Sequence, residues 1–284
     1  MACIICKSDQ EKKAFFYKST QYYKCKGCGL IRTLPFPSND ELIVHYQRGF
    51  DADNYSILSA NKDVYTHIYK QYLNIIKGTI ELRGKKILDI GCFTGDFLDM
   101  AKNEGALTFG VELQDVAAAI ANEKHSGRIL NCDVNNAVFK EKFDIITAFG
   151  LIEHIKKPEG LLRLAYSNLV EGGLLVLQTP NSGSLSARLL GKYWPPYTPV
   201  EHIHHFSSSN IKLFLKNFNF IDISVSPHFK QLSVEYVYAM LQTFGTEFYS
   251  LFTPIFNCLP RSVKKMILPF YGGEMIVLAR TPVK

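Results

Sequence analysis

The segment from residue 86 to residue 103 constrains the fold of this chain more than any other. It begins with a short apolar run, Lys86–Ile90, that predicts a strand, and it ends with a predicted helix over Asp96–Asn103. A tight loop flanked by Gly91 and Gly95 joins the two. A strand, a glycine loop and a helix in this order let backbone approach a ligand at the free N–H groups of the helix N-terminus. The segment therefore predicts a nucleotide-type binding loop.

Alternating strands and helices surround this loop. Apolar residues recur at helical spacing over residues 63–80, before the first strand, and residues 158–169 form another predicted helix. This alternation is typical of a doubly wound α/β fold with a parallel sheet, whose ligands lie at the carboxyl ends of the strands. The further strands are expected at residues 108–113, 128–130, 143–150, 172–181, 218–228 and 274–281.

Four of the seven cysteines form two C-x-x-C pairs, Cys3 with Cys6 and Cys25 with Cys28. Zinc favours four soft ligands in a tetrahedron, and two such pairs supply four thiolates. Short strands expected at residues 14–20 and 21–27 complete a zinc-ribbon pattern. Thiolates would fill the coordination sphere, so the zinc is expected to be structural. A redox pair or free structural thiols are the alternative for these cysteines.

The residues from Asp89 to Gly95 resemble the first motif of the class I S-adenosylmethionine-dependent methyltransferases, a strand with an acid followed by a G-x-G-x-G loop. The chain has Phe93 where that family usually has the central glycine. The run GLIEHI after the fourth strand is typical of these methyltransferases and foreign to nicotinamide-dependent dehydrogenases, the competing interpretation. The resemblance covers roughly residues 83–181 and implies a Rossmann-like sheet of seven strands with the last strand antiparallel.

The resemblance also implies which residues hold S-adenosylmethionine. Asp89 would order the loop and the amino group of the cofactor, while Gly91 and Gly95 would give its backbone room. Glu112, which lies 21 residues after Gly91, would accept the ribose hydroxyls, and Asp133 would accept the adenine amino group. The remaining cofactor-binding residues implied by the resemblance are Phe93, Leu113 and Phe149.

Histidines mark the expected reactive end, because methyl transfer often removes a proton from the acceptor and histidine suits that proton near neutral pH. His154 follows Glu153 after the fourth strand. In the resembled fold, this position faces the methyl-transfer pocket. His202 and His205 stand in an H-h-x-x-F-S segment that many small-molecule methyltransferases carry, and we expect both to line the pocket. A purely structural role for these histidines and a three-histidine metal site that includes His204 are the alternatives.

Three parts are expected along the chain: a zinc-ribbon-like module over residues 1–45, a helical connector over 46–82 and the methyltransferase domain over 83–284. Within that domain, residues 182–210 are expected to form a lid, and Ser207 or Ser208 to begin a helix. An aromatic-rich insertion over 228–273 replaces a plain hairpin loop. It is interpreted as an extra helical pair on the core, a dimer contact or an interfacial helix with basic residues on lipid headgroups.

The expected function is O-methylation of a small, sugar-like acceptor, since a cysteine-rich module before this domain resembles the sugar methyltransferases of antibiotic and surface-polysaccharide pathways. A ribosomal-RNA base methyltransferase is one alternative. Six lysines of the module would then face the RNA, and several of its aromatic residues would stack on bases. A non-catalytic zinc-ribbon adaptor is the other. The net charge of +6 demands no nucleic acid. Without a signal peptide or a run of about 18 apolar residues, we expect a cytoplasmic protein, with a homodimer as one interpretation of the insertion.

Overall fold

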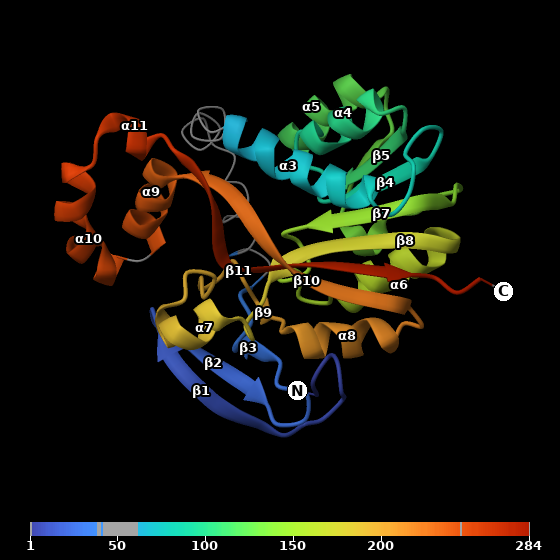
Figure 1. Ribbon diagram of the computed structural model, residues 1–284. Helices are drawn as coiled ribbons and strands as arrows, with labels where there is room; N and C mark the ends of the chain where they lie inside the picture. The colour runs from blue at the N-terminus through green and yellow to red at the C-terminus, as the bar shows by residue number, and fades with distance from the viewer. Residues whose placement is uncertain (1, 39–40, 42–61, 245, 284) are drawn as a thin grey trace.

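A seven-stranded sheet forms the centre of the molecule in the computed structural model, which describes residues 2–38, 41, 62–244 and 246–283 (Figure 1). The strand order is β10-β11-β8-β7-β4-β5-β6, and β11 runs antiparallel to both of its neighbours. This order and the reversed last strand confirm the predicted Rossmann-like fold. The strands are β4 (Lys86–Ile90), β5 (Leu107–Glu112), β6 (Ile129–Asn131), β7 (Phe143–Phe149), β8 (Leu169–Pro180), β10 (Ile221–Ser233) and β11 (Ile267–Arg280).

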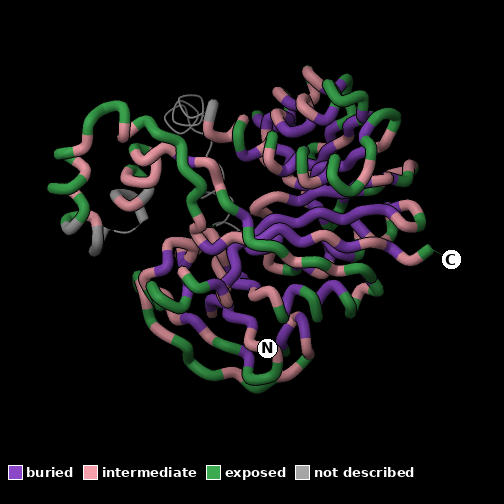
Figure 2. The backbone as a smooth tube through the Cα atoms, in the orientation of Figure 1, coloured by how far each residue is buried: buried purple, intermediate pink, exposed green. Residues whose placement is uncertain are grey.

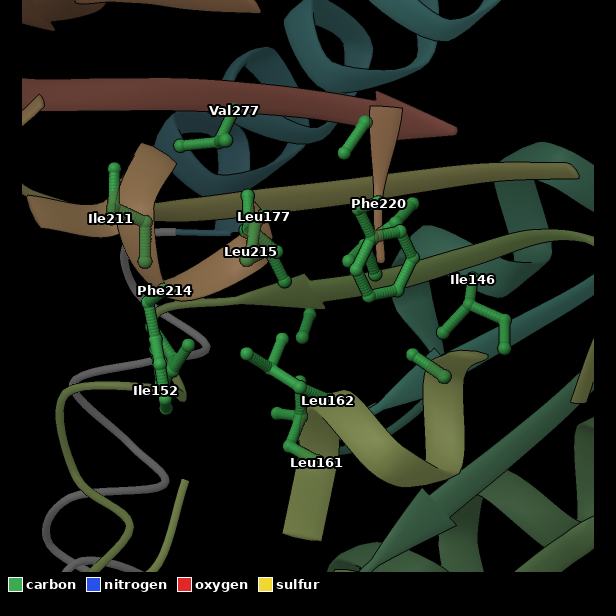
Figure 3. Packing of buried hydrophobic residues seen from close by; sticks show 14 of the residues in the cluster. Ile146, Ile152, Leu161, Leu162, Leu177, Ile211, Phe214, Leu215, Phe220 and Val277 are labelled. Carbon is green, nitrogen blue, oxygen red and sulfur yellow. The ribbon is translucent and has the colours of Figure 1, made fainter. Parts of the chain in front are cut away.

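Helices cover both faces of this sheet (Figure 1). One face packs against α3 (Lys62–Lys77), α4 (Asp96–Asn103) and α5 (Asp115–His125), and the other against α6 (Glu159–Asn168) and α8 (Ser208–Lys216). Figure 3 shows the second interface, where Leu161 and Leu162 of α6 and Phe214 of α8 meet Ile146 and Leu177 of the central strands. Central strands buried on both faces read as nearly continuous apolar runs, which explains why the sequence predicted them.

The N-terminal module is a second sheet of four strands in the order β1-β2-β3-β9. Its hairpin of β1 (Glu11–Tyr17) and β2 (Thr20–Cys25) is joined by Lys18 and Ser19, which have φ of 45° and 59°. Two left-handed residues make a tight hairpin turn. The expected strand over residues 14–20 was wrong here, because it ran through this turn. Neither turn residue is a glycine or asparagine, so the sequence did not mark the reversal.

The fourth strand of the module comes from a distant part of the chain. β9 (His204–His205) pairs with β3 (Ile31–Thr33), so residues of the expected lid complete the N-terminal sheet. The module also packs against α8, where the Asn217 side-chain amide donates to the carbonyl of Ile5 at 2.7 Å. The cysteine module and the sheet with the glycine loop therefore share a continuous interface. The expected boundary between module and connector, at residues 45 and 46, lies outside the described residues.

The expected lid holds a short helix, α7 (Leu185–Leu190), a 3₁₀ turn, η2 (Gly191–Tyr193), and the start of α8. Ser207 caps α8, and its backbone N–H donates to the Asn210 side chain in a reciprocal capping box. The sequence predicted Ser207 or Ser208 as the N-cap of this helix, and Ser207 is the N-cap. Trp194, which is buried, donates from its indole N–H to the carbonyl of Gly272 at 2.8 Å and ties this segment to β11.

Strands β10 and β11 continue beyond the sheet as a two-stranded ribbon that carries three helices, α9 (Val234–Phe244), α10 (Thr246–Cys258) and α11 (Arg261–Lys264). Figure 1 shows this part projecting from the body. We call residues 229–273 the arm. The last two expected strands were too short at this end, since β10 continues to Ser233 and β11 begins at Ile267. Across the described residues, no helix is both long and apolar enough to cross a membrane.

Candidate functional site

The glycine loop between β4 and α4 holds three residues in the left-handed conformation. Gly91 and Gly95 both have φ of 78°, and Phe93 has φ of 49°. A non-glycine residue pays roughly 1–2 kcal/mol for this conformation, which explains why the resembled family usually has glycine at the position of Phe93. The Phe93 N–H donates to Glu112 Oε2 at 2.8 Å, and this bond helps hold the strained residue in place. The departure from the family motif therefore preserves the shape of the loop.

Glu112 stands at the end of β5 and links the loop to the next strand. Its Oε1 accepts the N–H of Gln114 at 2.8 Å, while its Oε2 accepts the N–H of Phe93. Burial raises the pKa of Glu112, and these backbone hydrogen bonds oppose the rise. Leu113 beside it is 52% exposed, so an apolar ring could lie against its side chain. A fixed carboxylate next to an open apolar side chain suits a ribose and its adenine.

Asp89 lies within β4 and is completely enclosed. Its carboxylate accepts the Thr147 hydroxyl of β7 at 2.6 Å. Burial raises the pKa of Asp89 to about 7, and the hydrogen bond from Thr147 opposes that rise. A nearby cation such as the amino group of S-adenosylmethionine would favour the ionised form of this carboxyl. The side chains around the loop thus fit the cofactor that the resemblance implies.

His125, at the end of α5, supports the loop from behind. Its Nδ1 is 2.9 Å from the Thr108 hydroxyl, and its Nε2 is 3.3 Å from the carbonyl of Gly95. A Cβ atom added at Gly95 would approach His125 Nε2 to 2.9 Å. Gly95 is therefore required by close packing as well as by its backbone conformation.

The other predicted cofactor residues surround the same end of the sheet. Asp133 caps a short 3₁₀ turn, η1 (Val134–Asn136), through Oδ1, which accepts the Asn135 N–H at 2.7 Å. Phe149 ends β7, and its ring stacks on Tyr72 of α3 at 4.2 Å between centroids. The strand-to-helix loops of a doubly wound sheet bring these residues to one edge.

Glu153 is the most deeply buried charged residue at the expected reactive end. It is 3% exposed, and its Oε2 accepts the Thr179 hydroxyl of β8 at 2.9 Å. Burial raises the pKa of Glu153 to about 8. The backbone carbonyl of Glu153 also accepts the N–H groups of Ile203 and His204, at 2.8 and 3.0 Å. These bonds fix the loop after β7 against the segment that carries the other histidines.

All three predicted catalytic histidines meet at this place. The rings of His154 and His202 are 4.7 Å apart between centroids, and those of His202 and His205 are 6.2 Å apart. Ligand atoms of Glu153, His154 and His202 lie within 4.8 Å of one another. A metal site with His202, His204 and His205 was one alternative, but the described histidines and carboxylates that converge are Glu153, His154 and His202.

The histidines differ in what surrounds them. His202 Nδ1 is 2.7 Å from the carbonyl of Pro196, which requires a proton on Nδ1 and leaves the lone pair on Nε2. Burial lowers the pKa of His202. His205 is buried between Tyr22 and Tyr197, and burial with the neighbouring imidazoles lowers its pKa well below the usual value. The lowered pKa values favour the neutral form of His202 and His205.

The four paired cysteines converge as the zinc prediction requires. The Sγ atoms of Cys3 and Cys28 are 3.5 Å apart, as are those of Cys6 and Cys25, and all four lie within 4.8 Å of one another. A tetrahedral zinc ion with Zn–S bonds of about 2.3 Å separates its sulfurs by roughly 3.8 Å. None of the four cysteines is in a disulfide. The donor set and its spacing fit a tetrahedral zinc ion held by thiolates.

Sequence reasoning missed several partners of these residues. Thr147 and Thr179 each hold one buried carboxylate, and Tyr72 packs on Phe149 from a helix that precedes the sheet. His125, singled out by no motif, supports Gly95. A threonine near the end of a buried strand is a weak signal for such a role, because it fits a strand equally well.

The sequence matches a known family over residues 62–225, more than half of the chain, and this family is described as a methyltransferase domain. A curated relative, the ubiquinone biosynthesis O-methyltransferase of Pseudomonas entomophila, is 28% identical over 116 residues, which are 38% of this chain and 50% of that protein. The matching proteins of two Pseudomonas putida strains give the same identity and shares. The chain thus spans about half the length of the curated relatives it matches.

Two solved structures share the fold. A methyltransferase of Thermotoga maritima, described as a possible histamine N-methyltransferase, superposes with a TM-score of 0.52 at 18% identity, over 85% of this chain and 97% of the other. The phosphoethanolamine N-methyltransferase 2 of Haemonchus contortus, solved with S-adenosylhomocysteine, gives a TM-score of 0.58 at 19% identity, over 89% and 63%. Together with the family match and the seven-stranded sheet, they confirm the predicted resemblance: this chain belongs to the methyltransferase domain family and has the fold of the S-adenosylmethionine-dependent methyltransferases.

Proposed function

We propose that this protein transfers the methyl group of S-adenosylmethionine to a hydroxyl of a small, sugar-like acceptor. The observation that carries the proposal is the position of Glu153, His154 and His202 at the carboxyl ends of β7 and β8, the same edge of the sheet as the glycine loop. When bound, the cofactor supplies a sulfonium methyl. The protein's own task is then to align the acceptor and to remove its proton.

His202 is the proposed proton acceptor. The carbonyl of Pro196 fixes its tautomer, so the lone pair lies on Nε2, and burial keeps the ring neutral. His154 packs against this ring, and Glu153 stands behind His154 with its Oε1 at 3.9 Å from His154 Nε2. The His205 ring lies 6.2 Å from that of His202 between centroids, and its backbone positions the segment by pairing with β3 of the N-terminal sheet. We assign the proton to His202 and positioning to His154 and His205.

The proposed cofactor residues are Asp89, Gly91, Phe93, Gly95, Glu112, Leu113, Asp133 and Phe149. Oxygen as the acceptor atom is supported by the matched relatives, which are named O-methyltransferases. The sugar class is supported by the cysteine-rich module in front of the domain, the arrangement that resembles sugar methyltransferases. We also propose that Cys3, Cys6, Cys25 and Cys28 hold one structural zinc ion, because their sulfurs match its tetrahedron.

The test is transfer of tritium-labelled methyl from S-adenosylmethionine to free sugars, nucleotide-linked sugars and phenols. We expect at least one hydroxyl acceptor to be labelled. His202→Asn should slow the transfer 100-fold or more, in the range for a general base, with little change in cofactor affinity. Lys212→Gln, on the exposed side of α8, is the control. Full transfer by His202→Asn would remove the proposed role of that residue, and labelling of nitrogen alone would refute the O-methylation proposal.

RNA methylation is the second candidate, and one observation favours it. A shallow depression of about 430 Å³ beside the cysteines is lined by Lys12, Lys24 and Lys26. Against it, Tyr22 is fully buried and cannot stack on a base, and one face of the Phe15 ring is taken up by Tyr22, although Phe16 is 62% exposed. Binding of ribosomal RNA that falls steeply with salt, and that Lys24→Glu abolishes, would favour this candidate over the sugar acceptor.

The non-catalytic adaptor is the third interpretation. Phe93 was its only support, and Phe93 adopts the left-handed conformation that the loop needs. Cofactor binding without transfer to any acceptor would favour the adaptor.

A further inference from the structure

The helices of the arm pack mainly on one another. Tyr238 of α9 stacks on Phe256 of α10 with ring centroids 3.7 Å apart, and its hydroxyl is 3.1 Å from that of Thr253. The base of α9 reaches the main core through Tyr236 and Val237. Figure 1 shows α10 and α11 farther out, away from the central sheet. The outer helices therefore have their own small aromatic interior, and their other faces are left to the surroundings.

Large apolar side chains remain exposed on this outer part. Ile255 of α10 is 62% exposed, and four residues within the run 266–270 are 36–50% exposed. Each residue of the run 266–270 is exposed, and Figure 2 colours the outer part of the arm mainly as exposed and intermediate. Soluble proteins rarely leave four large apolar side chains exposed within a run of five residues, as in 266–270, unless the run binds something. The exposed set comprises Phe252, Ile255, Met266, Ile267, Leu268 and Phe270.

The charges of the same stretch have one sign. Residues 248–273 contain no aspartate or glutamate, whereas they contain Arg261, Lys264 and Lys265. The ammonium group of Lys264 lies 4.7 Å over the Phe256 ring, and Lys265 adjoins the exposed apolar run. The acids of the arm, Glu235 and Glu247, lie near the N-terminal ends of α9 and α10. Exposed apolar side chains next to cations are the pattern of a segment that binds an anionic lipid surface.

We propose that residues 248–273 bind the surface of an anionic lipid bilayer. The arm would lie on the membrane, since no described helix is long and apolar enough to cross it. A second copy of the chain is the poorer occupant. A two-fold interface built on this stretch would bring six cations of Arg261, Lys264 and Lys265 into one contact, and the stretch itself contains no acid to pair with them.

The arm also leads directly to the reactive end. Lys230 and Glu274, at the base of the ribbon, form an ion pair, and Glu274 Oε2 accepts from the Gln178 side chain of β8 at 2.8 Å. A bilayer under the arm would thus lie on the side of the molecule where the strands end. Lipid binding needs neither cofactor nor acceptor, so it is measured independently of the proposed methyl transfer.

The test is co-sedimentation of the purified full chain with phosphatidylcholine vesicles, with and without phosphatidylglycerol. We expect binding that requires phosphatidylglycerol and weakens as salt rises. The triple variant R261E/K264E/K265E should lose at least a hundredfold in affinity, since each cation near an anionic surface contributes about fivefold. The charge-matched control K140E/K212E/K216E, which reverses three exposed lysines elsewhere, should bind within threefold of the natural protein.

A fluorescent reporter distinguishes insertion from simple charge attraction. The single tryptophan, Trp194, is buried, so an added tryptophan at an exposed position reports its own surroundings. Ile267→Trp should shift its emission to shorter wavelength only when phosphatidylglycerol vesicles are present. Equal binding to both vesicle types, equal losses in both triple variants, or no binding by the folded protein would overturn the proposal. A lipid-independent shift together with dimer formation in sedimentation equilibrium would instead assign the stretch to a second copy.

Discussion

Replacing Glu112 tests the proposed cofactor site most directly. Its carboxylate accepts two backbone N–H groups at 2.8 Å, from Phe93 and Gln114, and is proposed to accept two ribose hydroxyls as well. A hydrogen bond to a charged group contributes roughly 1.5–3 kcal/mol. Losing the two ribose bonds in Glu112→Ala should therefore cost at least about 3 kcal/mol of binding free energy, a weakening of more than a hundredfold.

Calorimetric titration with S-adenosylhomocysteine measures this loss. Asp115→Ala, which removes an exposed acid three residues away at the start of α5, is the matched control and should bind like the natural protein. Thermal unfolding without ligand shows separately what the two backbone bonds contribute to stability. If folded Glu112→Ala binds within threefold of the natural protein, Glu112 does not hold the ribose, and the placement of the cofactor on this loop is refuted.

Three further predictions concern stability and metal content. Metal analysis should find roughly one zinc per chain, and Cys28→Ser should lower that content and destabilise the β1-β2-β3-β9 sheet, whereas Cys258→Ser should do neither. Because the pKa of Asp89 is raised to about 7, the contribution of its protonated form to stability is full below about pH 4 and is lost as the pH rises to 7. The free energy of unfolding in urea should therefore be higher for Asp89→Asn than for the natural protein, and the difference should grow between pH 4 and pH 7 toward the order of 4 kcal/mol. Trp194→Phe, which leaves the carbonyl of Gly272 without its indole donor, should lower the free energy of unfolding by about 2 kcal/mol, and an unchanged denaturation midpoint would contradict that role.

Local pattern was sufficient for the glycine loop. The apolar run before Gly91 and the glycine-flanked loop after it predicted β4 and α4 at their observed bounds. These elements depend on residues within a few positions of each other, so the sequence alone carries the information. The four cysteines were equally readable, because thiolates at C-x-x-C spacing have few other uses in pairs.

Contacts between distant segments were not readable in the same way. Pairing of β3 with β9 joins Ile31 to His205, and a strand of two residues has no periodicity to detect. The bond from Thr179 to Glu153 depends on β7 and β8 lying side by side in register. Such partners are set by the packing of the whole sheet, so the histidines were predicted as candidates but their neighbours were not.

The β3–β9 pairing gives the cysteine cluster an influence on a reaction in which it takes no part. Zinc held by its sulfurs would stabilise the sheet whose edge strand, His204–His205, begins two residues after His202. Oxidation of these thiols would remove the ligands of the proposed zinc ion and loosen the sheet to which that edge strand belongs. Oxidation of these four thiols should therefore slow methyl transfer, and restoring the thiols with reductant and zinc should bring activity back.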